Sequence, residues 1–309
     1  MLSLLQLEYI VAVAQHRHFA KAAETCFVTQ PTLSMQIQKA EEELNALIFD
    51  RSRQPISLTD VGAVLVEQAK IVLREHQNML DMVKDFRNDI GGTLHLGIIP
   101  TIAPYLLPLF AGDFLRAFPQ VQLKIRELTT FQISKALLND ELDVAILATP
   151  LKENYILEMP LFYEEIMIYS QPEHRFAQLE AVPMSELSKE KIWLLSQGHC
   201  FRSQIINICN IDEPKNSSSG LDYESGSLES LRRLVDKEGG VTLLPELAVT
   251  EKNTQVHSLC APLPLREISL VYARHFAKHK LLKTLANFIQ KNIPAHLLNP
   301  KRGQTVEWK

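Results

Sequence analysis

The first sixty residues carry a helical pattern of apolar and polar positions. Apolar side chains recur every three or four residues through segment 4–13, and a second short apolar segment covers residues 19–27. A third helix is expected to begin after Thr29, a good N-cap residue, with Pro31 in its first turn, and to run to Leu44. Two short helices, a tight turn and a third helix are the layout of a helix-turn-helix reader of DNA.

Polar residues lead this third helix, and arginines follow it. The helix is expected to enter the major groove, and segment 45–58, with short strand-like pieces around Pro55, is expected to form a wing beside it. Arginines in a wing are suited to phosphates or the minor groove. A three-helix core with no DNA role has the same pattern. The candidate DNA contacts are Gln30, Thr32, Ser34, Gln36, Arg51 and Arg53.

The pattern changes twice in the remaining chain. Residues 59–89 form a long helical pattern with an interrupted apolar face, which predicts a dimerising linker helix that ends at Gly91 and Gly92, a natural hinge. From Thr93 onward strand-like apolar runs alternate with helices, which predicts parallel βαβ units. A second unit starts near Glu165, and the chain is expected to return to the first unit through a strand at 268–273 and a helix at 281–293. The polar tail from residue 300 is expected to be frayed.

Composition narrows the class of protein. A chain of 309 residues that is 46% hydrophobic can bury more than one core. The net charge is −4, so charge alone gives no signal for nucleic acid. The N-terminal segment is amphipathic and lacks a basic region and a cleavage site, and no apolar run reaches the roughly 18 residues of a membrane span. We therefore expect a cytoplasmic protein that does not associate with membranes.

The segment 198–209, GHCFRSQIINIC, places Cys200 and Cys209 nine positions apart. A helix over residues 201–208 would separate their Cα atoms by about 13.5 Å, and a strand would separate them further. A disulfide needs Cα atoms within about 7 Å, so bonding these thiols would unmake any regular conformation of the segment. The imidazole of His199 and the guanidinium of Arg202 are expected to favour a thiolate at Cys200, the form that attacks peroxide.

The same two thiols also fit less reactive roles. Free cysteines often pack inertly in a core, and a structural disulfide fits poorly with a cytoplasmic protein. A zinc site made by the two cysteines and a histidine is conceivable, but the chain has no C-x-x-C pair, so we expect no metal and no cofactor. Cys26 and Cys260 are interpreted as structural thiols.

Residues 19–62, FAKAAETCFVTQPTLSMQIQKAEEELNALIFDRSRQPISLTDVG, resemble the winged helix-turn-helix of LysR-type transcriptional regulators. The resemblance implies a regulator, not an enzyme, that binds double-stranded promoter DNA as a homodimer or homotetramer, with RNA polymerase as a further partner. It adds Thr29 and Pro31 to the DNA contacts. It also implies an α/β fold class with three domains: the winged helix-turn-helix at 1–60, the linker helix at 61–90 and a two-lobed, periplasmic-binding-protein-like sensor at 91–309. Lobe I takes about 91–163 and 268–300, and lobe II about 164–267.

Motifs along essentially the whole chain resemble the hydrogen-peroxide sensors of this family: GIIPTIAPYLLP, RELTTFQ, GHCFRSQ, SLESLRRLV, GGVTLLPELAV and REISLVY. The resemblance implies that Cys200 is the peroxidatic cysteine and Cys209 the resolving one, and that their disulfide forms reversibly. It places Thr101, Thr130, His199 and Arg266 in a peroxide pocket. Threonine hydroxyls can donate to and accept from peroxide, and a guanidinium can stabilise the departing oxygen. Thr129 is an alternative to Thr130, and Ser203 stands where relatives often carry an acid.

These observations give one main hypothesis and two competitors. The main hypothesis is a DNA-binding regulator that senses hydrogen peroxide through the Cys200–Cys209 disulfide and controls oxidative-stress genes. The first competitor is a LysR-type regulator that responds to a small molecule in the cleft between its lobes, with incidental cysteines. The second is a thiol peroxidase or solute-binding protein with a helical N-terminus. The missing secretory signal counts against solute capture.

Overall fold

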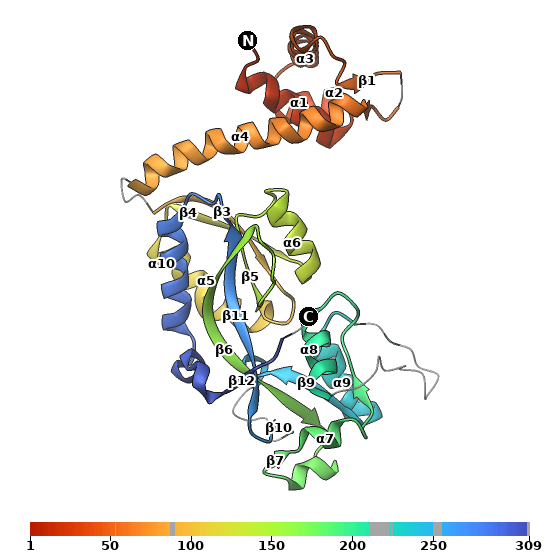
Figure 1. The fold of residues 1–309 in the computed structure, drawn as a ribbon, viewed down its shortest axis with the longest axis vertical. Helices are drawn as coiled ribbons and strands as arrows, with labels where there is room; N and C mark the ends of the chain where they lie inside the picture. Colours follow the sequence, from red (N-terminus) through yellow and green to blue (C-terminus); the bar gives the residue numbers. More distant parts are fainter. Residues whose placement is uncertain (53, 87–89, 210–222, 224, 250–254, 308–309) are drawn as a thin grey trace. The chain divides into compact units, whose positions relative to one another are not determined.

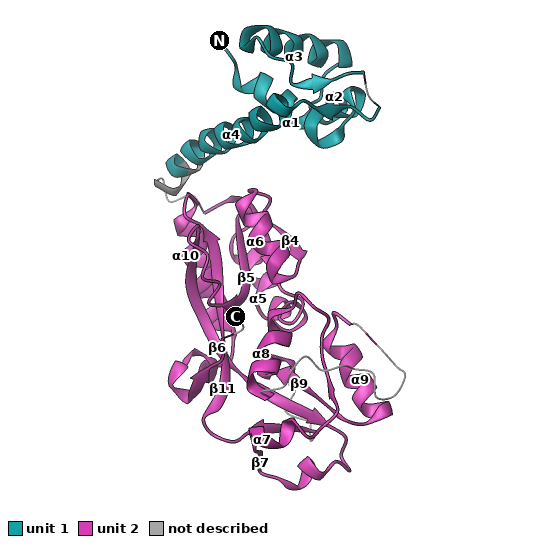
Figure 2. Ribbon diagram, turned by 45° about the vertical axis from the view of Figure 1, so that its right-hand side comes forward, with its two compact units in different colours: residues 1–87 teal, residues 88–309 magenta. Residues whose placement is uncertain are grey.

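The computed structural model describes residues 1–309 except 53, 87–89, 210–222, 224, 250–254 and 308–309. The chain divides into two units, residues 1–87 and 88–309, which Figure 2 colours separately. The first unit is mainly helical, and the second combines a mixed sheet with helices (Figure 1). The α/β fold class with a helical N-terminal part is therefore confirmed.

Three helices form the centre of the first unit, as the apolar pattern predicts. Ser3 and Gln6 form a capping box at the start of the first helix, and the Thr29 hydroxyl accepts a hydrogen bond from the Thr32 N–H at the start of the third. Ala22 and Ala23 are buried, so the second helix can pack closely against its neighbours. The helices are α1 (Leu4–His16), α2 (Phe19–Thr25) and α3 (Gln30–Leu44).

The predicted wing is an antiparallel pair of short strands, β1 (Phe49–Asp50) and β2 (Ser57–Leu58). A buried carboxylate, Glu41 of α3, holds the chain that enters it. Its Oε1 accepts from the N–H groups of Ile48 (2.8 Å) and Phe49 (3.2 Å), and its Oε2 is paired with Arg51 (2.8 Å). The wing is thus attached to α3 by a side chain that satisfies two backbone donors.

The long helix α4 (Asp60–Phe86) packs its first turns into the core of the first unit, where Val66 and Ala69 are buried. Gly62 is needed at the start of α4, because a Cβ there would lie 2.0 Å from the Ile48 carbonyl oxygen. Along its length, the helix also exposes apolar side chains. These are Val61, Val64, Ile71, Val72, Met79, Leu80, Met82 and Val83.

The second unit opens with the βαβ units that the alternating pattern predicts. The strand β3 lies between β4 and β5 and is parallel to both, and the two crossover helices are α5 and α6. Their apolar residues share one core with the C-terminal helix α10. The elements are β3 (Gly92–Ile98), α5 (Ala103–Ala117), β4 (Val121–Glu127), α6 (Thr130–Leu138), β5 (Val144–Thr149) and α10 (His279–Asn292).

Two long strands, β6 (Ile156–Ser170) and β11 (Leu263–Ala273), pair antiparallel, and β6 continues from this first core into a second one (Figure 1). The sheet is therefore mixed, with the order β4-β3-β5-β11-β6-β10-β7: the predicted parallel βαβ units are present, and antiparallel strands extend the sheet beyond them. Strand β9 pairs with β6 and with β8. The second core contains β7 (Ala181–Val182), α7 (Met184–Leu187), β8 (Ile192–Trp193), α8 (Cys200–Cys209), α9 (Leu228–Glu238), β9 (Val241–Pro245) and β10 (Val256–Leu259).

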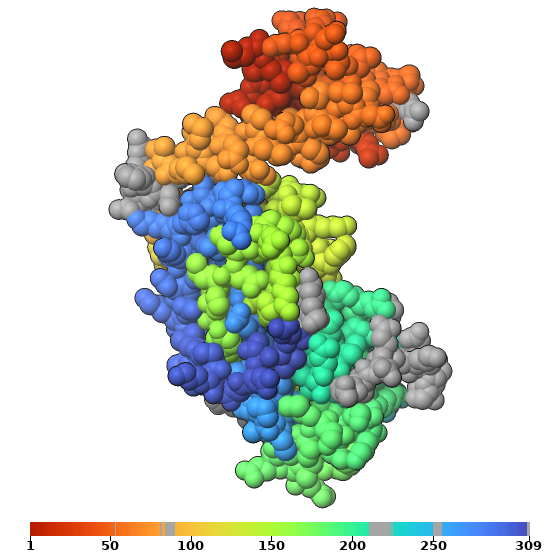
Figure 3. Space-filling model, viewed as in Figure 1, coloured from red at the N-terminus to blue at the C-terminus, as the bar shows by residue number. Residues whose placement is uncertain are grey.

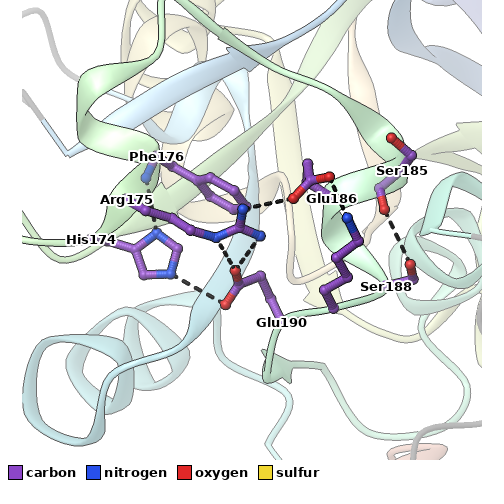
Figure 4. Close-up of polar contacts among 8 residues, drawn as sticks. His174, Arg175, Phe176, Ser185, Glu186, Ser188 and Glu190 are labelled. Atoms are coloured by element: carbon purple, nitrogen blue, oxygen red, sulfur yellow. Dashed lines mark hydrogen bonds and ion pairs between the residues drawn. The ribbon is translucent and has the colours of Figure 1, made fainter.

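A network of ion pairs ties the short 3-10 helix Arg175–Gln178 to the segment around α7 (Figure 4). Arg175 contacts Glu186 (2.6 Å) and Glu190 (2.7 Å), and Lys189 contacts Glu186 (2.6 Å). His174 lies 3.3 Å from Glu190. The side chains of Arg175 and Lys189 are exposed, so solvent screens their ion pairs and these add little to stability.

The long helix is described as far as Phe86, and Gly92 begins β3 with a φ of 94° and its N–H bonded to the Gln120 carbonyl. A hinge at Gly91 and Gly92 stays a prediction. The expectation of a frayed polar tail from residue 300 is wrong. The tail forms a 3-10 turn, Pro300–Arg302, and the strand β12 (Gly303–Thr305), which pairs in parallel with β11. Backbone hydrogen bonds to β11 order this tail. Such bonds do not depend on side-chain polarity, so the polar composition of the segment did not predict its order.

Candidate functional site

Helix α8 carries both thiols of the predicted pair, one at each end. Cys200 is its first residue and Cys209 its last, and each is 3% exposed. Cys200 packs in the first core, with β5 and α6, whereas Cys209 packs in the second core. A ten-residue helix holds their Cα atoms about 13.5 Å apart, so a disulfide between them requires α8 to unwind. All four cysteines are free thiols.

A buried guanidinium lies behind Cys200. Arg266 of β11 is fully buried, and its Nη1 donates to the Thr101 hydroxyl (3.1 Å) while its Nη2 donates to the Thr101 carbonyl (3.2 Å). Its Nε donates to Glu164 (2.7 Å), and its guanidinium carbon lies 4.8 Å from the centre of the Phe201 ring. Thr101 therefore holds Arg266 and does not cap α5, whose N-cap residue is Ile102.

A pocket of about 290 Å³ opens on the other side of Cys200. Three of the predicted residues line it, namely Thr130, His199 and Cys200, while Thr101 and Arg266 are not among its lining residues. The pocket is larger than hydrogen peroxide requires, since a water molecule takes about 30 Å³ in the liquid. Its other lining residues are Phe131, Ser134, Lys135, Glu153, Tyr155, Gly198 and Ser203.

The two adjacent threonines have different places. Thr129 is half-buried and caps α6, forming a capping box with Gln132. Thr130 is 3% exposed, and its hydroxyl has no regular hydrogen-bond partner among the described residues. Because it lies beside the Cys200 sulfur, this hydroxyl is available to a thiolate or a bound peroxide.

The expected origin of the Cys200 thiolate is wrong. His199 is buried and burial lowers its pKa, so the ring is neutral, and Arg202 donates instead to the Leu195 carbonyl (3.0 Å). Burial raises the pKa of Cys200, and the Thr130 hydroxyl and the Arg266 charge counter part of that rise. The backbone N–H of Phe201, in the first turn of α8, acts in the same direction.

No group among the described residues stabilises a thiolate at Cys209. Burial alone raises its pKa to about 12, so it is a thiol at neutral pH as long as it stays in the second core. Cys26 and Cys260 are partly buried and lie outside both cores' interiors. The two ends of α8 thus differ in chemistry as well as in place.

The ordered tail packs against α8. The side chain of Gln204 donates to the Val306 carbonyl (2.9 Å), and that of Asn207 donates to the Glu307 carbonyl (2.9 Å). Gly303 allows the approach of β12 to β11, because a Cβ there would lie 2.1 Å from the Leu263 carbonyl oxygen. Figure 3 shows the C-terminal end, in dark blue, against the surface around α8. Unwinding α8 would break both of these bonds.

The predicted DNA contacts cluster at the start of α3. The side chains of Thr29, Gln30, Pro31 and Thr32 are exposed, and Ser34 is half-buried. Gln36 is half-buried and accepts a hydrogen bond from Gln6 (3.4 Å), so it faces α1 as well as solvent.

The wing residues differ from the prediction in part. Arg51 is exposed but paired with Glu41, and its guanidinium lies 5.2 Å from the centre of the Phe19 ring. Arg53 lies outside the described residues. Met35 and Gln38, which the sequence did not single out, are exposed on α3.

Metal ligation and membrane insertion find no support among the described residues. No group of three or more His, Cys, Asp or Glu side chains there is placed to hold a metal ion. No helix within the same described part of the chain is both long and apolar enough to cross a membrane.

Two family models match the chain. Residues 4–63 match the bacterial regulatory helix-turn-helix protein, lysR family, and residues 87–294 match the LysR substrate binding domain. The chain belongs to the LysR family. It is therefore a DNA-binding transcription regulator and not an enzyme, as the resemblance at residues 19–62 implied.

Relatives within the LysR family match over nearly the whole length. The hydrogen peroxide-inducible genes activator of Dickeya chrysanthemi is 38% identical over 299 residues, which cover 94% of this chain and 96% of that protein. The DNA-binding transcriptional dual regulator OxyR of Escherichia coli K12 is 37% identical over 297 residues, covering 94% and 95%. The structure of a full-length OxyR variant from Pseudomonas aeruginosa is similar with a TM-score of 0.77 and 34% identity, covering 95% of this chain and 99% of that one.

Proposed function

We propose that this LysR-family regulator senses hydrogen peroxide through a reversible Cys200–Cys209 disulfide and thereby changes its action on oxidative-stress promoters. Residues 1–60 read DNA, 61–90 link two subunits, and 91–309 form the two-lobed sensor. The observation that carries the proposal is the placement of the two thiols. They lie at opposite ends of one helix and in two different cores, and within the described part of the chain an arginine is held behind Cys200 but not behind Cys209.

The chemistry assigns a separate role to each cysteine. The Cys200 thiolate attacks one oxygen of hydrogen peroxide, an S–O bond forms, the O–O bond breaks, and the departing hydroxide takes a proton to become water. Arg266 stabilises charge on the thiolate and on the departing oxygen, while Thr130 and Thr101 orient the reacting groups. Cys209 then attacks the sulfenic sulfur, the S–S bond forms and a second water leaves. One peroxide is reduced and two thiols are oxidised.

Other partners follow from the same proposal. The exposed start of α3 supports binding to double-stranded promoter DNA, with Thr29, Gln30, Pro31, Thr32, Ser34, Gln36, Arg51 and Arg53 as contacts. The exposed apolar side chains of α4 support a homodimer or homotetramer. RNA polymerase is a further partner, and the cytoplasm is the proposed location.

The stoichiometry of oxidation tests the proposal. Without a reductant, the chain should consume about one hydrogen peroxide and lose two of its four thiols. Peroxide consumption and free thiols are measured together. If the thiols do not react, the small-molecule alternative is favoured. Rapid consumption of many equivalents in the presence of a dithiol would indicate a peroxidase.

The DNA-reading role of Gln30 has its own test. We expect Gln30→Ala to weaken binding to a specific site by about 1–3 kcal/mol, because a glutamine at the leading end of the groove helix reads base edges. Binding to random DNA should be unchanged, and fluorescence anisotropy measures both affinities. Gln38→Ala, further along α3, is a matched control for loss of a polar side chain. Equal loss on random DNA would mean that Gln30 only contacts the backbone.

A further inference from the structure

The partner of Arg266 is a carboxylate that the sequence did not single out. Glu164 of β6 and Arg266 of β11 are register partners in the antiparallel pair, and both side chains are fully buried. Oε1 of Glu164 accepts from Arg266 Nε (2.7 Å), and Oε2 accepts from the backbone N–H of Leu247 (3.2 Å). Glu164 is therefore fixed at both oxygens, and it fixes the guanidinium in turn.

This pair has an electrostatic consequence for Cys200. In a buried site a full positive charge acts strongly on a neighbouring group, and a negative charge beside it cancels part of that action. Arg266 favours the Cys200 thiolate, but Glu164 offsets its charge. Burial raises the pKa of Glu164, and the guanidinium and the Leu247 N–H counter part of that rise.

We propose that Glu164 is a positioning residue that holds Arg266 behind Cys200 and, by offsetting the charge of the guanidinium, restrains formation of the Cys200 thiolate. This role deepens the proposed function and rests on it. The Cys200 thiolate and the Glu164 carboxylate compete for one guanidinium. The regulator thus responds to peroxide at a rate that Glu164 restrains.

Other charged or titratable groups near the pair do not take over this role. Glu246, from the 3-10 helix Glu246–Ala248, is paired with Arg302 of the tail (2.6 Å) and with His296 (2.8 Å), so its charge is compensated locally. Tyr105 of α5 also faces the pair, and burial raises its pKa, so it is neutral. Glu164 is therefore the carboxylate that faces Arg266 directly.

The experiment measures alkylation of Cys200 as a function of pH. Glu164→Gln keeps the shape and a hydrogen-bond acceptor but removes the charge. The midpoint of the rate–pH profile, read from the iodoacetamide-labelled Cys200 peptide by mass spectrometry, should move down by about one unit, which is about a tenfold gain in thiolate fraction below the midpoint. Glu165→Gln is the matched control. Successive side chains of a strand point to opposite faces, so this neighbour does not face Arg266, and its profile should match the wild type.

Three results would overturn the proposal: an unchanged midpoint in folded Glu164→Gln, a midpoint that moves up, or an equal downward shift in Glu165→Gln. If Glu164→Gln does not fold, Arg266→Met is compared with Arg266→Met/Glu164→Gln, which leaves no unpaired charge. If the two variants have equal midpoints, Glu164 acts on Cys200 through Arg266, as proposed. A lower midpoint in the double variant than in Arg266→Met would contradict that route. Because the probe is iodoacetamide, failure of the peroxide response in the wild type would overturn the proposed function without changing this result.

Discussion

A Cys200→Ser variant is expected to lose the response to hydrogen peroxide completely. Serine fits the same buried position at the start of α8 but forms no anion at neutral pH, so no S–O bond can form. The fold should persist, because the side chain changes by one atom and Arg266 keeps its bonds to Thr101 and Glu164. We expect the variant to bind promoter DNA as the untreated wild type does.

Footprinting of promoter DNA with and without one equivalent of peroxide measures this effect. The wild type should change its footprint and Cys200→Ser should not. Cys260→Ser is the matched control, since Cys260 is partly buried and lies outside α8, and it should respond as the wild type does. A peroxide-dependent footprint in Cys200→Ser would show that another group senses peroxide.

A Cys209→Ser variant should separate oxidation from the change of fold. Cys200 has its own surroundings in the first core, so it should still be oxidised. Without a second thiol, the sulfenic acid should persist, or proceed to sulfinic acid in excess peroxide. The variant should also lack the disulfide constraint, worth about 3 kcal/mol in the chain-entropy estimate, that holds the unwound form.

Two readouts test this variant. A sulfenate-selective reagent should label Cys200 in Cys209→Ser and only transiently in the wild type. Limited proteolysis detects unfolding of α8 and of the tail together, because unwinding α8 breaks the hydrogen bonds from Gln204 and Asn207 to the tail carbonyls. Both segments should become sensitive in the oxidised wild type and stay protected in the variant. Full sensitivity in Cys209→Ser would mean that the sulfenic acid alone drives the change.

Local sequence signals predicted the first unit well. The Thr29 cap, Pro31 in the first turn and the wing are each determined by a few adjacent residues, and the structure has all of them. The alternation of strands and helices likewise predicted β3, α5, β4, α6 and β5 in order. It did not predict that β6 and β11 pair antiparallel, because strand direction depends on partners distant in the chain.

The electrostatics of the thiol site could not be predicted from neighbours in the sequence. His199 and Arg202 flank Cys200, yet side chains one or two positions apart on a helix do not face each other, and Arg202 bonds to Leu195. The group that acts on Cys200 is Arg266, brought there by β11. Glu164 and the tail were missed for the same reason, since their contacts are long-range pairings with no local pattern.

The most direct test of the central claim is mass-spectrometric mapping of the thiols before and after one equivalent of hydrogen peroxide. The untreated chain should yield Cys200 and Cys209 as free thiols. After peroxide, most chains should yield one cross-linked peptide that joins Cys200 to Cys209, and a reductant should restore both thiols. A bond to Cys26 or Cys260, or oxidation that leaves Cys209 free in most chains, would contradict the account.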